Sequence, residues 1–136
     1  MTTQLQQICA GFETFPPASA GACAAAHDRF SNFSLDQYLE LLLQTNGLGE
    51  VIEAGGERHI HNMLMLPIEE AITESERDFR DEAFVIGRPG VDGILFVLQP
   101  GRPDVYAYYP IESEFSLIAE SVVEFLKAWT ANAIRL

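Results

Sequence analysis

The chain has 136 residues, of which 20 are Asp or Glu and 8 are Lys or Arg, so its formal net charge is −12. This length, together with 48% apolar residues, predicts one folded domain with its own core rather than a disordered chain. The acidic balance excludes direct binding to nucleic acid or to an anionic membrane, because no cluster of Lys and Arg is present to neutralise either surface.

The N-terminal residues lack the positive charge and the apolar stretch of a signal peptide. The longest run of large apolar residues, Ile94 to Leu98, is far too short to span a membrane. Two cysteines, Cys9 and Cys23, are too few for the disulfide framework of a small secreted domain. We therefore expect a cytoplasmic protein with reduced thiols.

Start and stop signals place four helices along the chain. Ser34 and Gln37, and later Ser121 and Glu124, have the spacing of a capping box, in which each side chain satisfies a free backbone donor of the other residue. Asn46-Gly47 tolerates the left-handed backbone of a helix end. The predicted helices run over about 17–30, over about 35–45, from Pro67 with Phe79 as the last apolar marker, and from Ser121 toward Ala133, and a shorter helix over 3–10 can precede them.

Short apolar or alternating segments between turn signals predict the strands. Ala54-Gly55-Gly56 separates the first two as a hairpin turn. Helices come first, a sheet follows and an amphipathic helix closes the chain, so we expect one α+β domain over 1–136. Its sheet should be mostly antiparallel or mixed, with about five to six strands. The expected strands are 50–53, 59–64, 84–86, 94–98, 105–109 and 115–118.

Three local patterns bear on catalysis and cofactors. His59 and His61 share one face of a predicted strand, a spacing that a metal site could use, but a third ligand is missing, so a structural or surface role is favoured. The glycines of 87–93 lack the Lys and Ser/Thr of a phosphate-binding loop and precede a strand, so they are expected in turns. Neither a Ser nor a Cys lies in a catalytic motif. We expect no enzyme activity, no cofactor and no metal.

The acidic residues are concentrated at 69–82, where seven acids accompany two arginines. A solvated helix face explains this cluster most simply, and a surface for a basic protein partner is the alternative. Tyr106 and Tyr108 alternate onto one face of a strand, so both lie in the core or both are displayed at an interface. The predicted partner-binding residues are Glu69, Glu70, Glu74, Tyr106 and Tyr108.

Short motifs follow one another at Ser34 to Gly47, Leu64 to Ile72, Phe84 to Gly87, Ile94 to Leu98, Val105 to Tyr108 and Ile118 to Leu126. Their order resembles the SUKH superfamily, the immunity-protein-like domains that include the fungal Smi/Knr cell-wall regulators, over about residues 17–130. The resemblance implies a bacterial immunity protein that binds and neutralises a cognate basic toxin, such as a nuclease. A regulatory or scaffold module without a toxin partner, and a small hydrolase or ligand-binding domain, are the alternatives.

Overall fold

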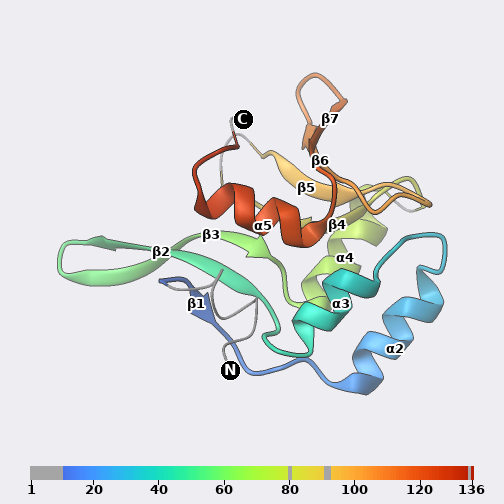
Figure 1. Cartoon of the computed structure of the whole chain (residues 1–136), viewed down its shortest axis with the longest axis horizontal. Helices are drawn as coiled ribbons and strands as arrows, with labels where there is room; N and C mark the ends of the chain where they lie inside the picture. Colours follow the sequence, from blue (N-terminus) through green and yellow to red (C-terminus); the bar gives the residue numbers. More distant parts are fainter. Residues whose placement is uncertain (1–10, 80, 91–92, 135) are drawn as a thin grey trace.

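The computed structural model describes residues 11–79, 81–90, 93–134 and 136, with only the backbone described for Ile52 and His61. The fold is the predicted α+β class with antiparallel strands and a C-terminal helix (Figure 1). In chain order the elements are β1 (Glu13–Thr14), α2 (Ala20–Arg29), α3 (Asp36–Leu42), β2 (Leu48–Ala54), β3 (Glu57–Met65), α4 (Ile68–Asp78), β4 (Phe84–Gly87), β5 (Leu95–Leu98), β6 (Val105–Tyr109), β7 (Glu114–Ala119) and α5 (Val122–Thr130).

The described strands form two sheets, whereas the sequence predicted one sheet of about five to six strands. The first sheet has the order β1-β2-β3 and the second has the order β4-β5-β6-β7. The additional strand is β1, which at two residues is too short to leave a periodic signal in the sequence. The β2–β3 hairpin extends away from the helices (Figure 1).

The four predicted helices are confirmed, with shorter bounds. α5 begins as expected, because the hydroxyl of Ser121 accepts the backbone N–H of Glu124 at 3.1 Å. Pro67 stands immediately before α4. The predicted helix over 3–10 and Cys9 lie outside the described residues. No helix of the described residues combines the length and the apolar character that a membrane crossing requires.

A close crossing of β3 and β4 joins the two sheets. Met63 and Arg88 exchange two backbone hydrogen bonds, of 2.9 and 2.7 Å. Gly87 lies at an irregularity in the β4–β5 pairing, and a Cβ atom added to it would be only 2.3 Å from the carbonyl oxygen of Leu64. Glycine is therefore required here for close approach of two backbones.

The glycines of the 87–93 segment were all expected in turns, and this expectation is wrong for Gly87. Gly90 and Gly93 have φ angles of 80° and 72°, the left-handed backbone expected of turn glycines. Gly87 instead ends β4 and contacts β3. Residues 91 and 92 lie outside the described part of the chain.

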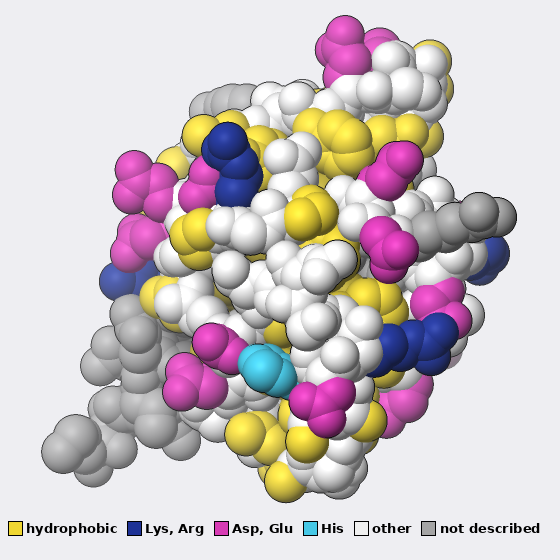
Figure 2. All heavy atoms as spheres, turned by 90° about the vertical axis from the view of Figure 1, so that its right-hand side faces the viewer, with side chains coloured by type: hydrophobic (Ala, Val, Ile, Leu, Met, Phe, Trp, Pro, Cys, Tyr) yellow, Lys and Arg dark blue, Asp and Glu magenta, His cyan; other side chains and the backbone are white. Residues whose placement is uncertain are grey.

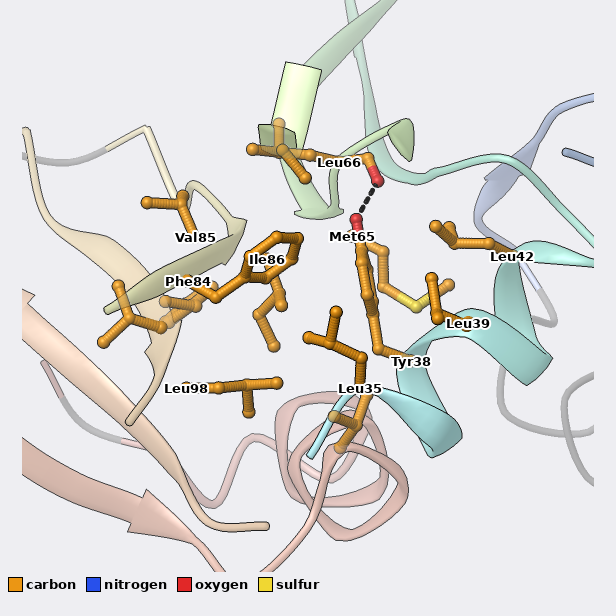
Figure 3. Packing of buried hydrophobic residues seen from close by; sticks show 14 of the residues in the cluster. Leu35, Tyr38, Leu39, Leu42, Met65, Leu66, Phe84, Val85, Ile86 and Leu98 are labelled. Atoms are coloured by element: carbon orange, nitrogen blue, oxygen red, sulfur yellow. Dashed lines mark hydrogen bonds between the residues drawn. The ribbon is translucent and has the colours of Figure 1, made fainter. Parts of the chain in front are cut away.

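Tyr38 of α3 is fully buried in the main core (Figure 3). Its hydroxyl donates a hydrogen bond of 2.6 Å to the carbonyl oxygen of Leu66, which lies between β3 and α4. Burial raises the pKa of this hydroxyl well above its ordinary value. The ring packs edge-on against Phe84 of β4, with ring centroids 5.9 Å apart. One side chain thus connects α3 with β4 and with the segment that joins β3 to α4.

Two side chains of the α3 segment, Gln37 and Asn46, cap other helices. Within the described residues the capping box of Ser34 and Gln37 is not formed. The N-cap of α3 is Leu35, which makes no side-chain capping bond. The Oε1 atom of Gln37 accepts the N–H of Val123 in α5 at 2.8 Å. The Oδ1 atom of Asn46 accepts the N–H of Ile68 in α4 at 2.9 Å. The α3 segment therefore satisfies free donors at two other helix N-termini.

α4 and α5 cover opposite faces of the four-stranded sheet. Phe79, at the end of α4, packs edge-on against Tyr108 with ring centroids 4.9 Å apart. On the other face, Phe96 of β5 contacts Phe125 and Trp129 of α5. Because side chains alternate along a strand, β6 directs Tyr108 toward α4.

We predict that Gly87→Ala lowers the free energy of unfolding by about 2–3 kcal/mol, because a methyl group pressed against backbone cannot be relieved by a rotamer change. Urea unfolding measures this effect. Gly21→Ala is the matched control: its added Cβ would meet nothing within 4 Å, and alanine in a helix should stabilise the fold by up to about 1 kcal/mol. Wild-type stability of Gly87→Ala would show that β3 and β4 do not approach so closely.

Candidate functional site

A groove lies between α4 and the adjoining end of the four-stranded sheet. It consists of two hollows of about 290 and 600 Å³, which share Glu74, Arg77 and Arg88 in their walls. The smaller hollow is otherwise lined by polar residues of α4, and the larger one opens onto apolar and aromatic side chains. The remaining lining residues are Glu69, Glu70 and Thr73 in the first, and Asp78, Phe79, Gly93, Leu95, Tyr108 and Pro110 in the second.

The buried carboxylate of Glu74 lies where the two hollows of the groove meet. Its side chain is 8% exposed and forms an ion pair with the guanidinium group of Arg88. A second nitrogen of the same guanidinium lies 3.5 Å from a carboxylate oxygen of Glu70. The backbone of Arg88 is fixed by its two hydrogen bonds to Met63. Both ends of the Arg88 side chain are therefore held, one by the sheet crossing and the other by α4.

The simplest interpretation of the acidic cluster was a solvated face of a helix, and the acidic side chains of α4 do not all lie on such a face. That interpretation is wrong for Glu74, which is buried. Glu69 and Glu70 are exposed, and Glu69 Oε2 accepts a 3.3 Å hydrogen bond from the Asn46 amide. The described lining of the groove contains four carboxylates and two guanidinium groups, so it has a net negative charge. Among the residues that the structure describes, the ion pairs of the cluster are Glu70–Arg88, Glu74–Arg88, Glu76–Arg29 and Asp78–Arg77.

Acidic side chains are also dispersed elsewhere on the surface. On the face shown in Figure 2 they lie at separate points, with neutral, apolar and basic groups between them. The charge of −12 therefore acts at long range as a diffuse field, while the groove supplies local contacts.

Tyr106 and Tyr108 share one face of β6, as alternation predicts, but they differ in accessibility. Tyr106 is buried, and its hydroxyl lies 3.4 Å from both Asp104 and Arg102. Tyr108 is half-buried and lines the larger hollow of the groove. Neither alternative, both in the core or both displayed, describes the pair. Of this pair, Tyr108 is the one that is accessible from the groove.

The residues considered for metal binding lie apart from the groove. His59, in β3, has Nε2 3.6 Å from a carboxylate oxygen of Glu57, and the side chain of His61 lies outside what the structure describes. Among the described residues, no group of three or more His, Cys, Asp and Glu is placed to hold a metal ion. Cys23 is buried in the core, where desolvation, and then the charge of Glu69, raise the pKa of its thiol.

The sequence pattern did not indicate Arg88, Phe79 or Leu95 as groove residues, and of these Arg88 is the central one. Arg88 lies in the 87–93 segment, whose glycines, and not its arginine, are the feature that resembles a phosphate-binding loop. The available signal was a cation directly after a buried strand in a strongly acidic chain, since a charge so placed usually needs a partner.

Comparison with known protein families gives a match to the model described as SMI1 / KNR4 family (SUKH-1), over residues 17–128. The matched region contains all the described residues that line the groove. No curated protein matches the chain.

We predict that removing Arg88 destabilises the fold more than removing the charge of Glu74. Arg88→Met leaves a buried carboxylate without its cation and should cost about 2–3 kcal/mol, less than for a fully buried pair because Arg88 is 43% exposed. Glu74→Gln leaves a half-exposed guanidinium beside Glu70 and should cost about 1 kcal/mol.

Urea unfolding of both variants measures the difference. Arg77→Met is the control, because Arg77 is an exposed arginine of the same groove whose partner, Asp78, is its neighbour in sequence. It should leave stability unchanged. Equal losses from Arg88→Met and Glu74→Gln would contradict the assignment of Glu74 as the desolvated partner.

Proposed function

The chain belongs to the SMI1/KNR4 family (SUKH-1), and we propose that it is a non-enzymatic protein-binding domain whose partner docks over the α4 groove. The observation that carries the proposal is the composition of this groove. An ion-paired, polar end lies beside an end lined by Phe79, Leu95 and Tyr108. Aromatic side chains and arginine beside a polar rim are typical of protein interfaces. The groove is open to solvent, which supports a protein partner over an enclosed small ligand.

Within this role we favour a bacterial immunity protein that neutralises a basic toxin, such as a nuclease, inside the producing cell. A net charge of −12 attracts a basic protein at long range and raises its rate of association. Glu69 and Glu70 are exposed at the rim of the groove, where they can meet Lys or Arg of the partner. A nuclease bound there would have its phosphate-binding surface covered by carboxylates in place of nucleic acid.

The residues proposed for partner contact follow from their accessibility. Glu69, Glu70 and Tyr108 are placed to touch the partner directly. Glu74 acts through Arg88, whose side chain it holds at the groove centre. Tyr106 lies on the same face of β6 as Tyr108 but is buried, so it is not placed to touch the partner.

We predict that a toxic domain is encoded beside the gene of this chain, that co-expression of the two restores growth, and that Glu69→Lys/Glu70→Lys abolishes the rescue. The double reversal should weaken binding of that domain by about tenfold or more, because it places two cations opposite a basic surface. Surface plasmon resonance at low salt gives the dissociation constant, and circular dichroism checks folding.

Glu53→Lys/Glu57→Lys is the matched control, since it makes the same change in charge on the β2–β3 hairpin. It should weaken binding by less than about threefold. Equal weakening by the two double variants would show that total charge, and not the α4 rim, governs binding. A lack of rescue by the wild-type chain would oppose the immunity role and favour the regulatory or scaffold role.

A further inference from the structure

β7 is an edge strand with apolar side chains on its exposed surface. Among the described residues, β6 is the only strand paired with it. Phe115 and Leu117 are 38% and 57% exposed. An edge strand also presents unpaired backbone N–H and C=O groups, which another extended chain can bind.

The exposed face of β7 continues the aromatic end of the groove. Phe115 lies opposite Tyr108 in the β6–β7 pairing, and Leu117 lies opposite Tyr106, so the four side chains share one face of the sheet. The ring of Phe115 is 4.8 Å from that of Tyr108 and 6.3 Å from that of Phe79, measured between centroids. The β7 edge and the α4 groove therefore form one continuous surface.

Acidic residues flank β7 at both ends. Glu112 and Glu114 lie at its start and Glu120 lies just after its end, all exposed. Antiparallel pairing of two copies of β7 would bring Glu114 of one copy toward the end of the other that carries Glu120. Like charges placed opposite each other destabilise strand pairing, and each copy carries a net charge of −12. These charges oppose a second copy and favour a segment with basic ends.

We propose that β7 binds an extended segment of a basic protein partner as a fifth strand of the β4–β7 sheet. The segment has apolar residues at alternate positions, beside Phe115 and Leu117, and Lys or Arg at its ends, near Glu114 and Glu120. Backbone hydrogen bonds supply affinity in such complexes, and the alternating side chains supply specificity. The inference rests on the proposed protein-binding function and specifies the kind of segment that is bound.

Three synthetic peptides with blocked termini test the proposal by amide chemical-shift titration of the ¹⁵N-labelled chain. KVTVTVK should shift the amides of residues 114–120 and of the paired β6 residues. KVTPTVK should bind about fivefold or more weakly, because proline interrupts the backbone ladder. EVTVTVE should cause no shifts at β7. Equal binding of the first two peptides, or shifts from KVTVTVK that leave β7 unchanged, would overturn the proposal.

A pair of exposed leucine variants gives the matched control. Leu117→Lys should weaken KVTVTVK by about fivefold or more, because it removes an apolar contact and adds a like charge at the edge. Leu43→Lys, at the exposed end of α3, should leave the affinity unchanged. Similar affinities of the two variants, or a wild-type dimer in sedimentation that Leu117→Lys dissociates, would overturn the proposal.

The failure of this inference is distinguishable from failure of the proposed function. If Leu117→Lys loses the peptide yet rescues growth from the toxin as the wild type does, β7 does not bind the toxin and the immunity role stands. If the wild-type chain rescues no growth, the immunity role fails whatever the peptides show.

Discussion

The close backbone contact between β3 and β4 positions the rest of the molecule. Reciprocal hydrogen bonds between Met63 and Arg88 join the two sheets at the point where Gly87 passes the backbone of Leu64. The same bonds fix the backbone of Arg88, whose side chain then reaches the buried carboxylate of Glu74. The arrangement of the sheets and the centre of the α4 groove therefore depend on one crossing that only glycine permits.

Packing determines which acidic residues remain available for binding. The charge of Glu74 is engaged by Arg88, whereas Glu69 and Glu70 stay exposed at the rim. Long-range attraction comes from a net charge of −12 spread over the surface, and short-range contact from the rim and the aromatic end of the groove. In the proposed complex, the net charge raises the association rate of a basic partner, and the groove with the β7 edge determines the specificity of binding.

Local chemistry predicted the elements well, because periodicity and caps act over a few residues. The strand at 105–109 and the Ser121 cap are confirmed as predicted. Contacts between distant segments were not predictable. Gln37 has the spacing of a local capping box and Asn46 lies near a predicted helix end, yet their side chains cap helices that only the folded chain brings near. The burial of Glu74 likewise depends on Arg88, 14 residues away, which the sheet crossing delivers to α4.

Hydrogen–deuterium exchange of the chain, free and bound to the proposed toxin, tests most directly whether such a partner covers the α4 groove together with β7. The predicted result is slower exchange on binding in the first turn of α4, around Glu69 and Glu70, and along residues 114–119. Exchange at the turn of the β2–β3 hairpin, residues 54–57, should be unchanged. Slowing confined to this hairpin, with α4 and β7 exchanging as in the free chain, would contradict the assignment of the partner surface.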